Sequence, residues 1–167
     1  LAPFGSRISY SQYTDHWCHL KLDSLDYYFK APEKINTPIT RDTLIDHCNR
    51  LIGSPYLWGG KTPLGYDCSG FVQEVFKSVD INLKRDTSQQ IEDDRFPSIE
   101  LSSAQRGDIM FFDFEKKGVD HVGICYGDDQ VIHCGGYVKI QSIHDDSHKK
   151  LLDYIVEIKS IKNHLDG

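Results

Sequence analysis

The chain has 167 residues, 39% of them hydrophobic, which is enough for one domain with an ordinary core and a small additional unit. Its net charge of −6, without an extended Lys/Arg cluster, excludes the basic footprint of a nucleic-acid-binding protein. No apolar run approaches the roughly 18 to 20 residues that cross a bilayer, and the first residues lack a secretory pattern, so we expect no membrane span. We also expect a monomer.

The first 36 residues predict a small β unit. Period-two alternation favours short strands over residues 7–10, 16–22 and 27–30, the last ending before Pro32. Residues 35–40 look like a linker, because Pro38 prevents helix continuation and Thr40 is suited to cap a following helix. We therefore expect one domain over residues 1–36 and a second over residues 37–167.

The second domain is expected to begin with helices and continue with strands. Apolar residues recur at helical spacing from Leu44 to Ile52, and Gly53 ends that helix. A second helix is predicted from about Cys68 to Val79, with its apolar residues facing inward. Five strands are predicted over residues 109–114, 121–126, 130–134, 137–143 and 153–158. This order favours an α+β domain with an antiparallel sheet.

Cys68 follows a Gly- and Pro-rich loop and begins the second predicted helix. The unpaired N–H groups and partial positive charge of a first helical turn stabilise a thiolate relative to a thiol. This position therefore predicts a cysteine nucleophile. Backbone N–H groups of the same turn are expected to bind the oxyanion of the reaction.

The other cysteines show no such context. The chain has five cysteines, an odd number without the close spacing of a disulfide framework. This favours a reducing, cytoplasmic setting, with the cell envelope and secretion as alternatives. We expect Cys18, Cys48 and Cys125 to be small buried apolar residues.

Two of the eight histidines are candidates for the base that a cysteine nucleophile needs. His121 begins one predicted strand and His133 lies on the next. A three-residue loop over residues 126–128 would place them opposite each other, with His121 as base and His133 orienting it. A two-residue turn at Gly127 and Asp128 would send His133 to the other face, so the pairing requires an odd loop or a bulge.

A metal site is the alternative use of these residues. Cys68, His121, His133 and Cys134 are suitable ligand types, but they lack the closely paired spacing of structural zinc sites. We expect no metal and no organic cofactor, and we expect the other histidines to be surface or core residues.

A resemblance to a known family rests on six ordered segments: Tyr56-Leu-Trp-Gly-Gly, Tyr66-Asp-Cys-Ser-Gly-Phe-Val, Arg85-Asp-Thr-Ser-Gln-Gln, Gly107-Asp-Ile-Met-Phe-Phe, Asp120-His-Val-Gly-Ile and Ile132-His. Over about residues 40–158 the chain resembles the NlpC-type cell-wall cysteine peptidases. The resemblance implies a reduced papain-like fold with Cys68, His121 and His133 as catalytic triad. It also implies cleavage of bacterial cell-wall peptides after γ-D-glutamate, next to a diamino acid.

Residues 4–36 are similar to the later strands of a bacterial SH3-type domain. Such a domain would bind wall peptide or close one side of the cleft. The resemblance also implies that Tyr56, Asp67 and Ser69 bind the N-terminal amine of a short muropeptide, which is chemically reasonable for a carboxylate near an ammonium. The alternative is that Asp67 only caps the helix and Ser69 fills its first turn.

Further cleft residues follow from the same resemblance. It assigns Arg85, Thr87 and Gln90 to a polar cleft wall, and it leaves open which hydroxyl of the Arg-Asp-Thr-Ser segment faces the substrate. Trp58 is expected to pack rather than to bind substrate.

The leading hypothesis is a cysteine endopeptidase that acts on cell-wall peptides or free muropeptides through an acyl-enzyme. An amidase or acyltransferase of related fold is one alternative, because water and an amine compete for the same acyl-enzyme. A non-catalytic module that binds wall peptide is the other alternative, with Cys68 as a vestige.

Overall fold

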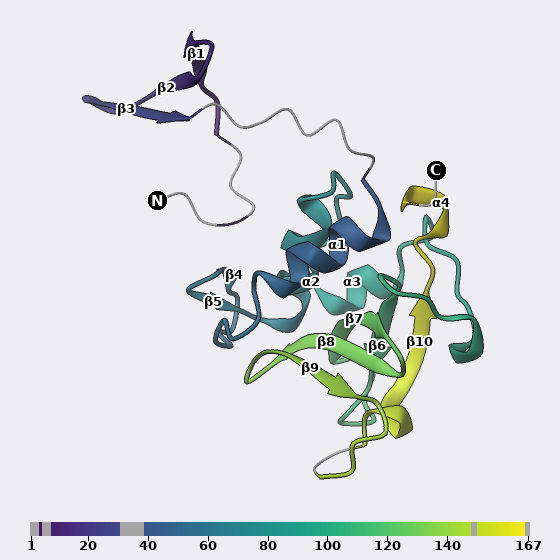
Figure 1. Ribbon diagram of the computed structural model, residues 1–167. Coiled ribbons are helices and arrows are strands. Elements are labelled where there is room, and N and C mark those ends of the chain that lie inside the picture. The colour runs from purple at the N-terminus through teal and green to yellow at the C-terminus, as the bar shows by residue number, and fades with distance from the viewer. Residues whose placement is uncertain (1–3, 5–7, 31–38, 148–149, 166–167) are drawn as a thin grey trace. The chain divides into compact units, whose positions relative to one another are not determined.

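The computed structural model describes residues 4, 8–30, 39–147 and 150–165 (Figure 1). Apart from the first five residues, its internal contacts divide the chain into two compact units, residues 6–38 and residues 39–167. The predicted domain boundary after residue 36 lies outside the described residues. Each unit is described by itself below.

The smaller unit is an antiparallel sheet with the strand order β1-β2-β3. Its strands are β1 (Ser11–Thr14), β2 (Trp17–Leu22) and β3 (Leu25–Lys30). The prediction of a first strand over residues 7–10 is wrong, because residues 8–10 form no strand and residue 7 lies outside the described part. The tight turn that pairs Thr14 with Trp17 places residues 11–14, rather than the preceding ones, beside β2.

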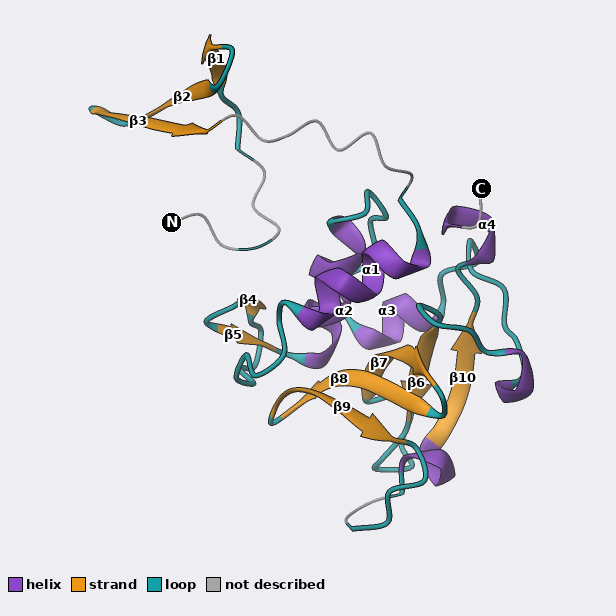
Figure 2. Cartoon of the chain, in the orientation of Figure 1, coloured by secondary structure: helices purple, strands orange, loops and turns teal. Residues whose placement is uncertain are grey.

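The larger unit contains a five-stranded sheet with the order β10-β6-β7-β8-β9, in which every neighbouring pair is antiparallel. Helices α1 to α3 lie on one side of this sheet (Figures 1 and 2). The mixed helix and sheet composition and the antiparallel pairing confirm the α+β prediction. The helices are α1 (Arg41–Asn49), α2 (Cys68–Lys77), α3 (Thr87–Ile91) and α4 (Lys162–Leu165). The strands are β4 (Lys61–Thr62), β5 (Gly65–Tyr66), β6 (Ile109–Phe112), β7 (His121–Gly127), β8 (Gln130–Gly135), β9 (Tyr137–Ser142) and β10 (Ile155–Lys159).

Both faces of the five-stranded sheet are buried. Alternate residues of β6 divide between two apolar clusters, with Ile109 and Phe111 in the cluster that includes the helices and Met110 and Phe112 in the other. The residues predicted to face inward on the second helix are all buried: Phe71, Val72, Val75, Phe76 and Val79. Val79 lies beyond the end of α2, because the helix ends at Lys77 instead of continuing to Val79. This packing holds α2 firmly against the central strands, which positions its N-terminus.

Helix α1 is shorter than predicted. Thr40 caps it with a reciprocal capping box to Thr43, but the helix ends at Asn49 instead of continuing to Ile52. Gly53 takes a φ of 86°, and the turn that leads into it leaves Ile52 48% exposed.

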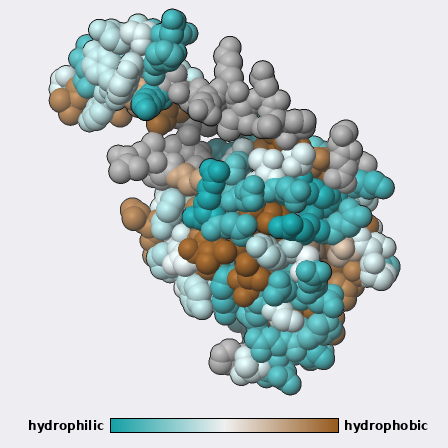
Figure 3. All heavy atoms as spheres, viewed as in Figure 1, coloured by the Kyte–Doolittle hydropathy of each residue, from teal (hydrophilic) through white to brown (hydrophobic). Residues whose placement is uncertain are grey.

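The described residues contain no helix long and apolar enough to cross a membrane. On the face of the larger unit seen in Figure 3, hydrophilic residues predominate and hydrophobic residues gather in separate patches.

Candidate active site

Cys68 is the first residue of α2, and Asp67 is the N-cap of this helix. The Asp67 carboxylate accepts a 2.7 Å hydrogen bond from the backbone N–H of Gly70, which fixes the first turn. The Cys68 sulfur lies 3.8 Å from the hydroxyl of Thr87 on α3. The sequence at this turn therefore places a thiol where helix N–H groups and one hydroxyl meet.

The environment of Cys68 acts on its thiol in two directions. Burial raises the pKa of the Cys68 thiol, and hydrogen bonds from Thr87 and from the backbone N–H groups of Ser69 and Val122 oppose that rise. Val122 directly follows His121, so the sulfur lies against the start of β7. The upward pKa direction favours the thiol over the thiolate in the resting protein.

His121 and His133 form a hydrogen-bonded pair. The distance from His121 Nε2 to His133 Nδ1 is 2.8 Å, and the two rings are nearly perpendicular at 89°. His121 is 8% exposed and His133 4% exposed. Phe112 and Phe114 pack against the His121 ring, with centroid distances of 5.9 and 5.3 Å.

The two histidines share a face through the bulge that the sequence-based prediction allowed, and not through the three-residue loop. The pairing of β7 with β8 places His133 opposite Gly123 instead of opposite His121, so the predicted three-residue loop is wrong. The strands are joined at Asp128 and Asp129, whose φ values of 51° and 55° fit a two-residue type I′ turn. A bulge between Cys125 and Gly127 adds the extra residue that keeps both imidazoles on one face.

Two glycines make room for this diagonal pair. A Cβ on Gly123 would approach the Cβ of His133 to 3.0 Å and the Cγ2 of Val131 to 2.6 Å. A Cβ on Gly135 would lie 3.0 Å from His133 Cε1 and 3.9 Å from His121 Cε1. On the β7–β8 ladder, the two histidines lie on one diagonal and the two glycines on the other. The histidine rings fill the space that side chains at the glycine positions would otherwise occupy. Sequence reasoning did not single out these glycines, because their role depends on the strand register.

Burial keeps both histidines neutral. Desolvation lowers the pKa of His121 and of His133 well below the ordinary histidine value of 6.5. The cation of Lys139 lowers the pKa of both further, while the Gln141 side chain on β9 raises that of His133. A neutral imidazole and a protonated thiol that line the same cleft are the combination that general-base catalysis requires.

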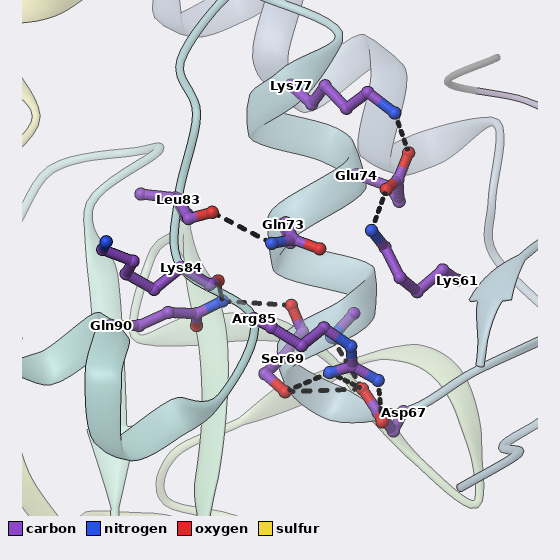
Figure 4. A network of polar contacts seen from close by, with 11 residues as sticks. Lys61, Asp67, Ser69, Gln73, Glu74, Lys77, Leu83, Lys84, Arg85 and Gln90 are labelled. Atoms are coloured by element: carbon purple, nitrogen blue, oxygen red, sulfur yellow. Dashed lines mark hydrogen bonds and ion pairs between the residues drawn. The ribbon is translucent and has the colours of Figure 1, made fainter. Parts of the chain in front are cut away.

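Asp67 is at the centre of a polar network with Arg85 and Ser69 (Figure 4). Arg85 makes a bidentate ion pair with the two oxygens of Asp67, and its Nη1 atom lies 2.9 Å from the Ser69 hydroxyl. The backbone N–H of Gly59 donates to the same carboxylate at 2.9 Å. These hydrogen bonds and the Arg85 charge hold the pKa of Asp67 below its usual range although burial opposes this.

The cleft beside Cys68 has a volume of about 820 Å³, and both Cys68 and His121 line it. His133 is buried behind His121. Of the other predicted site residues, five line the cleft: Tyr56, Asp67, Ser69, Arg85 and Thr87. Trp58 also lines it and is 87% exposed, so the expectation that Trp58 packs is wrong.

The polar residues that follow Arg85 lie in different environments. Thr87 is buried and directed at the Cys68 sulfur, whereas Ser88 is exposed at the cleft. Gln90 does not belong to the cleft wall, because it is 1% exposed and donates to the carbonyls of Ser69 and Lys84. It joins α3 to the start of α2 and so supports the turn that carries Cys68.

The remaining cysteines are free and buried. Cys134, a member of the alternative metal set, directs its sulfur at the Tyr66 carbonyl at 3.2 Å. Within the described ranges, no group of three or more His, Cys, Asp and Glu residues is arranged to hold a metal ion.

Comparison with known proteins identifies the family. The model of the NlpC/P60 family matches residues 53–157, which include Cys68, His121 and His133. The chain belongs to the NlpC/P60 family. The resemblance seen in the six sequence segments is thereby confirmed.

A relative from Bacillus cereus, named a gamma-D-glutamyl-L-lysine dipeptidyl-peptidase, is 34% identical to this chain over 108 residues. The match covers 64% of this chain and 32% of that protein, so the chain spans about a third of this relative's length.

Two solved structures share the NlpC/P60 fold. An NlpC/P60 family protein from Bacillus cereus has a TM-score of 0.75 at 24% identity, covering 93% of this chain and 53% of that one. RipD from Mycobacterium tuberculosis, named a non-catalytic NlpC/p60 domain protein, has a TM-score of 0.59 at 18% identity. The match covers 72% of this chain and 96% of RipD. These low identities show the fold alone.

Proposed function

We propose that this chain is a cysteine peptidase that hydrolyses bacterial cell-wall peptides at the bond between γ-D-glutamate and a diamino acid. The observation that carries the proposal is the 2.8 Å histidine pair, whose outer member shares a cleft with a cysteine at a helix N-terminus. The relative named as a gamma-D-glutamyl-L-lysine dipeptidyl-peptidase supports the choice of bond.

The proposed reaction has two stages. The Cys68 thiol loses its proton to His121 while its sulfur attacks the γ-carbonyl carbon, and backbone N–H groups at the start of α2 bind the oxyanion. His121 then gives the proton to the leaving amine as the C–N bond breaks, which leaves a thioester. Water attacks the thioester carbon, loses a proton to His121, and releases the γ-glutamyl product and the thiol.

His133 has an orienting role in this scheme. Its Nδ1 holds His121 Nε2, so that the other His121 nitrogen is available to the thiol. A neutral histidine in this place holds the base without a buried negative charge, which would be costly among apolar residues.

The substrate-binding residues form the part of the cleft beside α2. We propose that Tyr56, Asp67 and Ser69 bind the free amine of a short muropeptide and that Arg85 keeps the Asp67 carboxylate ionised and oriented. Thr87 hydrogen-bonds the thiolate in this proposal, while the exposed Ser88 is the hydroxyl that faces the substrate.

The proposal is tested by incubating tripeptide and tetrapeptide muropeptides with the wild type, Cys68→Ala and Cys125→Ala, followed by mass spectrometry. Cys125 is buried in the cluster away from the helices, so its variant is a matched control for loss of a thiol. We expect cleavage after γ-D-glutamate by the wild type and Cys125→Ala but not by Cys68→Ala. Unchanged peptides with the wild type would favour the wall-peptide-binding module, and products joined to an added amine would favour an acyltransferase.

For the smaller unit, we propose an SH3-type domain that contacts wall peptide. The antiparallel order β1-β2-β3 is consistent with the later strands of such a domain. Amide chemical-shift changes in β1–β3 on adding muropeptide to the full chain would support this role, and unchanged shifts there would contradict it.

A further inference from the structure

Gln141 lies on β9, the edge strand beside β8. The ladder pairs His133 with Lys139 and Val131 with Gln141, so Gln141 occupies a diagonal position next to His133. The distance from His133 Nε2 to Gln141 Oε1 is 3.3 Å. A chain of two hydrogen bonds therefore runs from His121 through His133 to Gln141.

The chemistry of an amide oxygen determines which atom donates and which accepts in each of these two hydrogen bonds. The oxygen only accepts hydrogen bonds, so a neutral His133 that contacts it carries its proton on Nε2. The Nδ1 atom of His133 then carries a lone pair and accepts a hydrogen bond. Its partner, His121 Nε2, must therefore carry the proton that is donated. The remaining His121 nitrogen, Nδ1, is consequently unprotonated and can accept the proton of the Cys68 thiol.

The opposite tautomer would disable the base. With the proton on His133 Nδ1, His121 Nε2 would have to accept, and a neutral His121 would carry its proton on Nδ1. No lone pair would then be available for the thiol. The location of a proton two side chains away from the sulfur thus decides whether His121 can act.

We propose that Gln141 is a positioning residue that sets the tautomers of both histidines and thereby makes His121 Nδ1 the base. The inference rests on the proposed cysteine peptidase function. Gln141 acts through His133 and does not touch the reacting atoms.

Other charged groups near the pair do not supply this direction. Lys139 faces His133 from the same strand as Gln141, but an ammonium is only a donor. The carboxylate of Asp120, next to His121 in the chain, accepts hydrogen bonds from the backbone N–H groups of Phe114 and Glu115. From α2, the Cys68 thiol faces the start of β7. Gln141 is the acceptor that the described part of the chain offers to His133 Nε2.

The direct test is nitrogen NMR of the full chain with labelled histidines, at a pH where both rings are neutral. We expect the Nε2–H form for His121 and His133 in the wild type and a mixture of forms in Gln141→Leu. An Nδ1–H form of His133 in the wild type, or the same single form in Gln141→Leu, would overturn the inference.

The functional test compares three variants. Gln141→Leu removes the acceptor, Gln141→Glu keeps an accepting oxygen, and Gln130→Leu makes the same Gln-to-Leu change on β8 outside the cleft. We expect Gln141→Leu to lower kcat about tenfold with KM unchanged, which corresponds to loss of one hydrogen bond in the reacting state. Gln130→Leu should behave as the wild type.

Gln141→Glu separates this role from a purely structural one. Its carboxylate should restore most of kcat and move the acidic limb of the kcat profile to higher pH, because an anion raises the pKa of His133. Equal kcat in Gln141→Leu and Gln130→Leu would contradict the inference. An unshifted profile in Gln141→Glu would contradict it even if Gln141→Leu were too unstable to compare.

A substrate-free measurement distinguishes failure of the inference from failure of the proposed function. The rate of Cys68 alkylation by iodoacetamide depends on transfer of the thiol proton and needs no peptide. A slower rate in Gln141→Leu without peptide cleavage by the wild type would reject the function and support the inference. Peptide cleavage with unchanged alkylation in Gln141→Leu would reject the inference alone.

Discussion

The protonation states of the polar groups on the two sides of the cleft are maintained by opposite means. On the side of Asp67, an ion pair with Arg85 and backbone N–H groups keeps the carboxylate ionised. On the side of His121 and His133, burial keeps both imidazoles neutral, and the rings of Phe112 and Phe114 pack against His121. The comparison teaches that the carboxylate charge in this cleft is stabilised by pairing, whereas the imidazoles are kept unprotonated by exclusion of water.

The largest expected effect is the response of stability to pH. The folded-state pKa of each histidine lies below its unfolded value of 6.5, so the unfolded chain binds more protons at mildly acidic pH. The stabilisation is complete above pH 6.5 and is lost as the pH falls, by up to about 1.4 kcal/mol per pH unit for each histidine. Urea denaturation between pH 7 and 5 should show this slope, and replacing both histidines with Gln should flatten it.

The carboxylate side predicts a different pH window. The pKa of Asp67 is below its usual 3.8, so its contribution to stability is present above that value and is lost only at lower pH. A wild-type slope confined to pH below 4, with none between 5 and 7, would mean that the histidines are not held neutral by burial.

The second effect concerns the ion pair. Arg85→Met should lower the free energy of unfolding by about 2 kcal/mol, because it leaves a largely buried carboxylate without its bidentate partner. Arg106→Met is the matched control, since the Arg106 contact with Asp42 is exposed and 3.5 Å long. The control should cost less than about 0.5 kcal/mol. Equal losses in the two variants by urea denaturation would show that the Asp67 pair behaves as a surface contact.

The third effect tests amine recognition. Acetylation of the substrate's N-terminus should lower kcat/KM about tenfold, near the lower limit for a charge-assisted hydrogen bond, because Arg85 already compensates the Asp67 charge. In Asp67→Asn, the free and acetylated substrates should be cleaved at similar rates. Equal rates on both substrates with the wild type would remove Asp67 from amine binding.

The smallest effect is at Thr87. Thr87→Val removes the hydroxyl that faces the Cys68 sulfur, so the pKa of the thiol should rise further and alkylation at pH 7 should slow about fivefold, as for loss of one neutral hydrogen bond. Thr87→Ser keeps the hydroxyl and should retain the wild-type rate. Identical alkylation rates in Thr87→Val and Thr87→Ser would show that the 3.8 Å contact does not stabilise the thiolate.

The sequence could predict those parts of the site that depend on neighbouring residues. Helical spacing located α2, and the Asp-Cys-Ser-Gly run indicated both a cap and a nucleophile. The segments around His121 and His133 could be assigned to strands, but their register could not be obtained by counting. Local patterns do not show where a bulge will form, and one extra residue reverses every later side chain.

Tertiary structure decided which side chains meet. Arg85 reaches Asp67 from 18 positions away, and Gln141 reaches His133 from a strand whose register is determined by the whole sheet. Gly123 and Gly135 matter only because the ladder places them around the two imidazoles. The sequence by itself determined the turn that carries Cys68, since its hydrogen bonds are local, whereas the proposed direction of the hydrogen-bond chain depends on long-range packing that no local pattern encodes.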